Sequence, residues 1–296
     1  MGKLSQSETS HNPLIEPTQS GANGAAHGDY RDYIDAHCHL MDPRLDQIRS
    51  AVIQRAQEKG VKFFIQGGVG PEDWERQVTL SEEYPGQIFP CFGIHPWWVF
   101  EHSELECEVA LKLLGMRLAQ AVALGELGLD LGPKAPVDSL ALQTLVFRKQ
   151  LELAREMGKP LVLHLVKAHD LALKELKAAQ KESDRPLKGI VHSFSGSLNQ
   201  AQAYIDLGLS ISVGGPLARA GYERLKDAVK KIPLENLVLE SDAPDQTSDL
   251  MRGQLNEPGE CLWEVARVVG ELKNITPEEV LIQSQKNCRS VFDLCL

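Results

Sequence analysis

The sequence predicts a closed parallel (β/α)8 barrel, the TIM-barrel fold, followed by one extra C-terminal helix. Short apolar runs alternate eight times with stretches of helical periodicity, and no two runs are joined as an antiparallel hairpin. Strands that alternate with helices pair in parallel, and eight such units in one chain favour a barrel over an open sheet. The chain has 296 residues, which leaves room for a barrel of about 250 residues once its ends are set aside.

Each predicted strand is a short apolar run, and each predicted helix repeats its apolar positions three and four residues apart. The strands are expected at 32–38, 61–67, 87–93, 121–126, 160–165, 187–192, 209–213 and 236–241. The helices are expected at 44–59, 71–83, 103–118, 138–157, 169–181, 197–207, 217–231 and 258–271, with a final helix at 276–294. The helix at 138–157 is the clearest, because Phe147, Leu151 and Ala154 share one face and Gly158 then stops it.

Composition limits the classes of protein to which this chain can belong. A hydrophobic content of 43% with 24% charged residues is typical of a globular protein, and no apolar run approaches the length of a membrane span. The net charge of −10 argues against a broad duplex-binding surface, but it allows a small metal-lined site that accepts a strand end. Six cysteines without a C-x-x-C spacing indicate reduced thiols and a cytoplasmic location. Residues 1–30 are expected to be a disordered extension, and residues 31–296 a single barrel domain.

The first predicted strand carries two histidines that could share a cation. Alternation in a strand puts three polar side chains on one face, Asp35, His37 and His39. The opposite face is expected to pack against the protein, and it carries Ile34, Ala36, Cys38 and Leu40. Two imidazoles on one face lie roughly 6–7 Å apart along the backbone and can converge on one metal ion. The alternative is a polar pair at a strand end that faces water.

Further potential metal ligands follow other predicted strands. In a barrel of this class, chemistry takes place at the C-terminal ends of the strands. Six histidine and acidic side chains are expected at that rim: His37, His39, Glu126, His164, His192 and Asp242. Taken singly, His164 could be a core histidine and Asp242 a loop cap, but six such side chains from five strands indicate a metal site.

Six motifs along the chain carry a resemblance to a known family. They are Asp35-Ala36-His37-Cys38-His39, Gly93-Ile94-His95-Pro96, Gly125-Glu126-Leu127-Gly128-Leu129-Asp130, Val191-His192-Ser193-Phe194-Ser195-Gly196, Leu239-Glu240-Ser241-Asp242-Ala243-Pro244 and Asn256-Glu257-Pro258. With these motifs the chain resembles the TatD family of metal-dependent deoxyribonucleases, which belong to the amidohydrolase-type barrels. The resemblance extends from about Tyr33 to Leu294 and implies the same six metal ligands.

The resemblance also suggests roles for individual residues. Nitrogen and oxygen ligands in this number favour two divalent ions (zinc, manganese or magnesium) bridged by Glu126, with His37, His39 and Asp242 on one ion and His164 and His192 on the other. The catalytic candidates are Asp242 as general base, Glu126, and His95 as a contact to the phosphate or leaving group. The candidate substrate contacts are His95, Asp130, Lys167 and Asn256, and Asp130 could also orient a ligand histidine.

One departure from the family concerns the substrate. Many members have an arginine shortly after the fifth-strand histidine, whereas Leu165-Val166-Lys167 follows His164 here, so Lys167, Arg219 or Arg252 would have to supply the charge. Trp97 and Trp98 could form a stacking platform for a terminal base, or they could seal their loop onto the barrel.

Three functional hypotheses follow from these residues. The first is a deoxyribonuclease that hydrolyses phosphodiesters at DNA ends or in single strands with water activated by two metal ions. The second is hydrolysis of a small amide, lactone or aminopurine on the same barrel, because fold and ligands alone do not fix the chemistry. The third is a catalytically idle barrel with a binding role, against which the complete ligand set argues. The sequence makes no prediction about oligomeric state.

Overall fold

The structure is a computed structural model, and it describes residues 32–183 and 185–296. The expected extension of residues 1–30 lies outside the described residues. The strands are β1 (Tyr33–Cys38), β2 (Val61–Gln66), β3 (Ile88–Phe89), β4 (Cys91–Phe92), β5 (Ala123–Asp130), β6 (Leu161–Val166), β7 (Gly189–Val191), β8 (Leu209–Val213) and β9 (Leu237–Leu239). All of their pairings are parallel, as predicted.

The strands follow one another around a barrel in sequence order. Strands β1 to β3 form one hydrogen-bonded group and β4 to β9 a second. Strands β3 and β4 together occupy one strand position of the barrel, with Pro90 between them. Because proline has no backbone N–H, it interrupts the hydrogen-bond ladder there. The ring closes between its last and first strands, where Asp242 N donates to His37 O at 2.9 Å and His39 N donates to Ala243 O at 2.7 Å. The predicted eight-stranded barrel is therefore confirmed.

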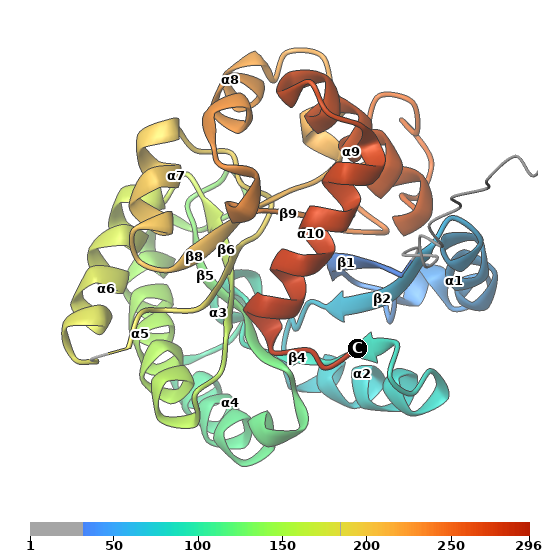
Figure 1. The fold of residues 1–296 in the computed structure, drawn as a ribbon. Helices are drawn as coiled ribbons and strands as arrows, with labels where there is room; N and C mark the ends of the chain where they lie inside the picture. Colours follow the sequence, from blue (N-terminus) through green and yellow to red (C-terminus); the bar gives the residue numbers. More distant parts are fainter. Residues whose placement is uncertain (1–31, 184) are drawn as a thin grey trace, which may run out of the picture. The chain divides into compact units, whose positions relative to one another are not determined.

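Helices surround this ring, as Figure 1 shows. They are α1 (Arg49–Glu58), α2 (Pro71–Glu83), α3 (Pro96–Glu101), α4 (Glu104–Arg117), α5 (Leu140–Met157), α6 (His169–Lys181), α7 (Leu198–Ile205), α8 (Glu223–Lys231), α9 (Pro258–Lys273) and α10 (Pro277–Phe292). Helix α5 ends at Gly158, whose φ of 63° is the left-handed conformation that the sequence predicted for a helix stop. Of the helices described, none is long and apolar enough to cross a membrane.

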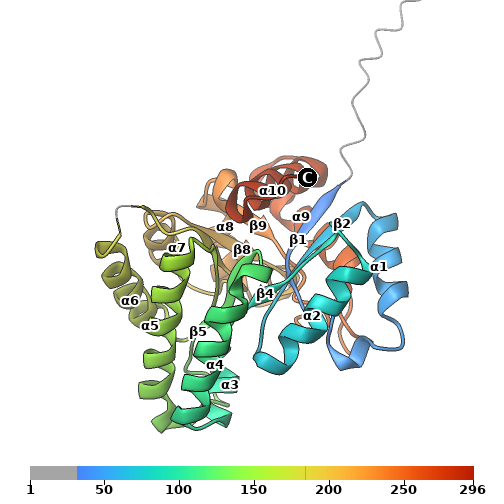
Figure 2. The same ribbon diagram turned by 90° about the horizontal axis from the view of Figure 1, so that it is seen from below.

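The predicted final helix has a definite position on the barrel. In both views α10 lies across one end of the ring of strands (Figures 1 and 2). Its side chains Cys288, Val291 and Phe292 belong to the same buried cluster as the inward-facing strand residues, among them Ile34 and Ile65. Helix α10 thus closes the N-terminal end of the barrel with apolar side chains, and the C-terminal end of the strands forms the open mouth.

Some predicted boundaries were wrong for local reasons. Helices α1 and α8 begin at Arg49 and Glu223, later than expected, because short 3₁₀ turns at 43–45 and 215–218 occupy the start of each predicted stretch. Helix α3 was not predicted. Glu126 does not end its strand, since β5 continues to Asp130 and carries Glu126 at a break in its register with β6.

The predicted face of the first strand also needs correction. The register of β1 with β2 shifts between Asp35 and Cys38, and such a bulge reverses the alternation of side chains. Asp35 consequently does not share a face with the two histidines; it is buried and accepts hydrogen bonds from the backbone N–H and the hydroxyl of Ser241. Cys38 packs in the outer core as expected.

Candidate metal centre

The structure brings the six predicted ligand residues together at the barrel mouth. They come from β1, β5, β6 and the segments that follow β1, β7 and β9. Three groups of side chains have ligand atoms within 4.8 Å of one another: His37 with Glu126 and His192, His37 with His39 and Asp242, and His95 with Glu126 and His164. All the ligand residues predicted from widely separated motifs therefore face one small volume.

Glu126 lies at the centre of this cluster. Its Oε2 is 2.8 Å from His192 Nε2 and 3.4 Å from His164 Nδ1. Its Oε1 is 3.3 Å from His39 Nε2 and 3.6 Å from His37 Nε2. The two oxygens of one carboxylate thus face two different pairs of imidazoles, which is the arrangement that a ligand shared by two ions requires.

The residues present fit a metal ion. His37 is fully buried, and neither of its ring nitrogens has a hydrogen-bond partner among the described residues. Burying a polar atom without a partner costs about 1–3 kcal/mol, so two such atoms on one ring call for a further ligand. Gly67 leaves space beside this ring, because a Cβ there would lie only 2.4 Å from His37 Cε1 and 2.5 Å from His39 Cε1. Imidazole and carboxylate donors around such a space suit a divalent transition metal.

Two carboxylates orient the ligand histidines from behind. His164 Nε2 lies 3.2 Å from Asp130 Oδ2, so the ring donates there and turns the lone pair of Nδ1 toward Glu126. His192 Nδ1 lies 3.6 Å from Glu240 Oε1, an electrostatic contact that is longer than a hydrogen bond, while its Nε2 faces the cluster. Glu240 is itself fixed, because it accepts hydrogen bonds from Ser193 N and from the Ser212 hydroxyl. In this class of site such outer carboxylates set which nitrogen can bind metal.

Comparison with known proteins identifies the family. The model of the TatD related DNase family matches residues 34–293 of the chain. The chain belongs to this family of metal-dependent hydrolases. YjjV, an uncharacterised metal-dependent hydrolase of Escherichia coli, is 34% identical over 262 residues, which cover 88% of this chain and 98% of that protein. The crystal structure of the E. coli YjjV has a TM-score of 0.78 at 32% identity and covers 90% of this chain and 99% of that one. Human deoxyribonuclease TATDN3 is 26% identical over 270 residues, 88% of this chain and 94% of that protein.

The predicted resemblance to the TatD family is therefore confirmed, and the chain is a metal-dependent hydrolase.

The carboxylates and imidazoles of this TatD-family site balance one another's charge, as a metal site requires. Burial opposes the charge of Glu126, but the positive charges of His192 and His37 hold its pKa well below the ordinary value. Burial also opposes protonation of His192, yet the carboxylates of Glu126 and Glu240 hold its pKa well above the usual histidine range. Protons on the imidazoles thus balance the carboxylates, and a bound cation would replace those protons.

His95 differs from the other histidines of the cluster. Its Nδ1 accepts the backbone N–H of Trp97 at 3.0 Å, as the N-cap of α3. Burial and the nearby positive charge of His164 lower the pKa of His95 well below its ordinary value, so the ring is neutral and carries its proton on Nε2. That nitrogen lies 3.7 Å from Glu126 Oε2. A ring with this tautomer is a hydrogen-bond donor to the site, whereas a metal ligand would need a free lone pair.

The predicted substrate contacts lie in different surroundings. Asp130 faces the site and is bonded to His164, and that hydrogen bond together with Gly132 N outweighs burial and lowers its pKa to about 2. Lys167 is exposed, with a φ of 54°, directly after β6. Asn256 is fully buried, with its amide donating to Ser241 O at 2.7 Å. A substrate cannot reach a side chain without exposed surface, so Asn256 holds the chain next to Asp242 instead.

The two adjacent tryptophans have separate environments. Trp97 is 41% exposed, its indole N–H donates to Asp130 at 2.7 Å, and its ring centre is 6.3 Å from that of His164. Trp98 stacks on His102 with ring centres 3.7 Å apart and packs against the core. Each of the two alternatives, a seal for the loop and a stacking platform, therefore fits one tryptophan. Trp98 packs the loop onto the barrel, and Trp97 presents a fixed ring at the mouth.

Sequence reasoning missed three residues of the site. Gly67 makes room for the imidazoles, and the Gly67-Gly68 pair after an apolar strand was an available signal. Glu240 orients His192, and a charged residue directly after the buried β9 was a second signal, because buried charges need partners. Gln246 donates to Asp242 and accepts from the Ser193 hydroxyl, and nothing in the local sequence marked it.

Proposed function

We propose that this chain is a deoxyribonuclease that hydrolyses phosphodiester bonds at DNA ends or in single strands, with two divalent metal ions. The observation that carries the proposal is the central carboxylate of Glu126, whose two oxygens face two separate sets of imidazoles. A pair of metal ions that share one carboxylate is the usual apparatus for displacement at phosphorus. The name of human deoxyribonuclease TATDN3, which aligns with 88% of this chain, supports the same chemistry.

The donor set suggests how the ions would be held. His37, His39 and Asp242 would bind one ion, His164 and His192 the other, and Glu126 both. Mixed nitrogen and oxygen donors favour zinc or manganese, and magnesium is the third candidate. Bound metal would acidify a water molecule and neutralise the charge of the phosphodiester.

One side chain of this site can accept a proton, and a second can donate a hydrogen bond to the substrate. Asp242 is ionised, because the nearby imidazoles of His37 and His39 outweigh burial and lower the pKa of its carboxyl, and Gln246 orients its Oδ2. It is the general base in this proposal, since it can accept the proton of the attacking water. His95 carries its proton on Nε2 and would donate a hydrogen bond from that nitrogen to the phosphate or the leaving oxygen.

The mouth itself suits a strand end more than a duplex. The chain has a net charge of −10, so it lacks the overall positive charge of a protein that covers duplex DNA without sequence preference. Near the metal centre, however, Trp97 offers an exposed ring with the Lys134 ammonium 4.7 Å from its centre. A base stacked there with its phosphate near Lys134 would be bound locally. All six cysteines are unpaired thiols, which suits the reducing cytoplasm that we propose as the location.

The proposal is tested by incubating single-stranded oligonucleotides with the protein and Mn²⁺ or Mg²⁺. Nucleotides are expected to be released, metal analysis is expected to find two ions per chain, and Asp242→Asn is expected to abolish release. The same preparation is assayed against a panel of small amides, lactones and aminopurines. Activity confined to that panel would overturn the deoxyribonuclease proposal in favour of small-molecule hydrolysis, and no effect of Asp242→Asn on any activity would support an idle barrel.

A further inference from the structure

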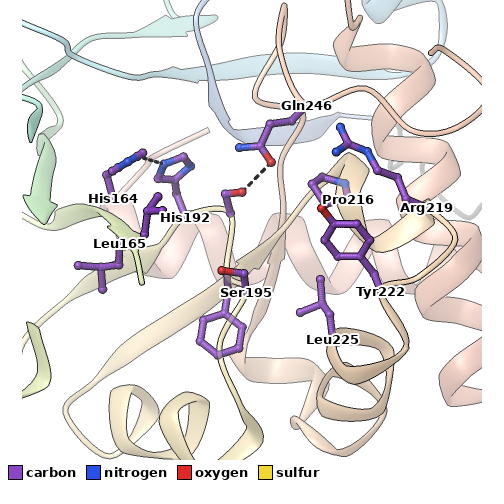
Figure 3. A pocket seen from close by; sticks show the side chains of 12 residues that line it. His164, Leu165, His192, Ser195, Pro216, Arg219, Tyr222, Leu225 and Gln246 are labelled. Carbon is purple, nitrogen blue, oxygen red and sulfur yellow. Dashed lines mark hydrogen bonds between the residues drawn. The ribbon is translucent and has the colours of Figure 1, made fainter. Parts of the chain in front are cut away.

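A cavity of about 210 Å³ opens beside the metal centre. His164 and His192 form one side of it, and Arg219, Tyr222 and Gln246 lie on the other (Figure 3). Because two of the candidate metal ligands line the cavity, a group bound inside it is adjacent to the reacting atoms. Its volume is small for a ligand pocket, which limits the occupant to about one nucleotide unit or less.

Arg219 supplies a positive charge to this cavity. Its Nε donates to Thr247 O at 2.6 Å, which fixes the side chain from one side. Among the ion pairs of the described residues none involves Arg219, whereas Arg252 pairs with Asp249 and Arg44 with Asp42. An arginine that lines a cavity in an acidic chain without an ion-pair partner is available to an anion. Its terminal nitrogens can bind two oxygens of one phosphate.

The rest of the lining suits a nucleotide. Within the described part of the chain, the hydroxyls of Ser195 and Tyr222 form no hydrogen bond, so both are available to a ligand. Pro216 and Leu225 provide apolar surface next to them (Figure 3). One charged donor, two hydroxyls and an apolar wall are the groups needed for a phosphate attached to a sugar and base.

We propose that this cavity binds the nucleotide next to the scissile bond, with Arg219 holding the phosphate on its far side. Arg219 then supplies the positive charge of the arginine that is missing after His164. As a consequence, the enzyme selects substrates that carry a second phosphate. The inference rests on the proposed function, because it assumes that the scissile phosphodiester lies at the metal centre.

Binding of thymidine 3′,5′-bisphosphate tests the cavity without any turnover. Calorimetry in the presence of Mn²⁺ is expected to show tighter binding of the bisphosphate than of either thymidine monophosphate. Arg219→Gln is expected to reduce this advantage about 10- to 100-fold, the loss typical of a charge-assisted two-pronged contact. Arg219→Lys, which keeps the charge, should lose less, and it serves as the test if the glutamine variant does not fold. The control is Arg267→Gln, because Arg267 is exposed and already paired with Glu271 on α9.

Hydrolysis of matched dinucleotides supplies the second measurement. The wild type is expected to cleave one of the terminally phosphorylated thymidine dinucleotides faster than the unphosphorylated one. In Arg219→Gln the ratio of these two rates is expected to fall toward one. An equal bisphosphate advantage in the wild type and Arg219→Gln, or no advantage in the wild type, overturns the cavity proposal. If the wild type cleaves no DNA but shows an Arg219-dependent bisphosphate advantage, the proposed function fails and only the assignment of Arg219 as a phosphate contact in the cavity stands.

Discussion

The two ends of the barrel bury side chains of opposite character. At the N-terminal end, Phe292 and Val291 of α10 pack against Ile34 and Ile65, and these contacts are wholly apolar. At the mouth, the fully buried His37 has two ring nitrogens without partners in the described part of the chain. The first end gains free energy from the burial of apolar side chains, and Ser284 and Asn287 of α10 add hydrogen bonds with the backbone of β9. The second end loses free energy until a ligand satisfies its buried imidazole nitrogens.

One strand contributes to both ends within a few residues. Strand β1 supplies Ile34 to the apolar plug and His37 to the metal cluster, and the bulge between Asp35 and Cys38 turns the second side chain into the mouth. The side chains that stabilise the fold by apolar burial thus lie at the N-terminal end of the strands, and the candidate metal ligands lie at the C-terminal end. Substitutions at the two ends should therefore affect different measurements.

The largest expected effect is at the mouth. Glu126→Gln removes the charge that both sets of imidazoles share, so nucleotide release should fall by about 10³-fold or more, since several kcal/mol of transition-state stabilisation are lost. A chelator should abolish the wild-type activity, and added Mn²⁺ should restore it. Thermal unfolding of the metal-free variant should remain cooperative, because the apolar end is unchanged.

The matching change at the opposite end is Phe292→Ala. Truncation of this buried ring leaves a cavity beneath the barrel and should reduce the free energy of unfolding by about 3–5 kcal/mol, measured by denaturant titration. The rate of nucleotide release at low temperature should stay close to that of the wild type. A loss of activity as large as that of Glu126→Gln in a folded Phe292→Ala preparation would contradict the separation of the two ends.

The adjacent tryptophans repeat this contrast within one turn of chain. Trp97→Ala should weaken the binding of single-stranded DNA by about 1–3 kcal/mol, as expected for one lost base stack, and leave thermal stability unchanged. Trp98→Ala should lower thermal stability and leave DNA binding unchanged, since that ring packs on His102 and the core. Trp97→Phe keeps an aromatic face and is the control. Equal DNA binding by Trp97→Ala and the wild type would exclude stacking.

Much of this separation could be predicted from the sequence, because parallel strands all expose their C-terminal ends at one rim. This rule alone predicts that His37 and Asp242 lie close together, although some two hundred residues separate them in the sequence. The family motifs then supplied the pairing of Glu126 with its histidines. The structure confirms the fold, and it shows these side chains facing one another.

What could not be predicted depends on departures from regular geometry. The bulge in β1 moved Asp35 to the opposite face, and a period of two residues contains no signal for such an insertion. The break in register at Glu126 likewise lies within a strand that continues to Asp130. Contacts such as that of Gln246 with Asp242 depend on how a loop after β9 folds back, which local sequence does not specify.

The smallest expected effect concerns His169, a buried histidine at the first position of α6. Its Nδ1 lies 3.1 Å from the Tyr204 hydroxyl, its Nε2 has no hydrogen-bond partner among the described residues, and burial lowers its pKa in spite of the negative charge of Asp170. Because the unfolded chain binds this proton more readily, His169 should stabilise the fold least at acid pH and fully above the ordinary histidine pKa. The melting temperature of the wild type should therefore fall more steeply between pH 7 and pH 5 than that of His169→Phe. The control Tyr204→Phe keeps the histidine and should keep the steep slope, and parallel slopes for the wild type and His169→Phe would show that His169 is not the titrating group.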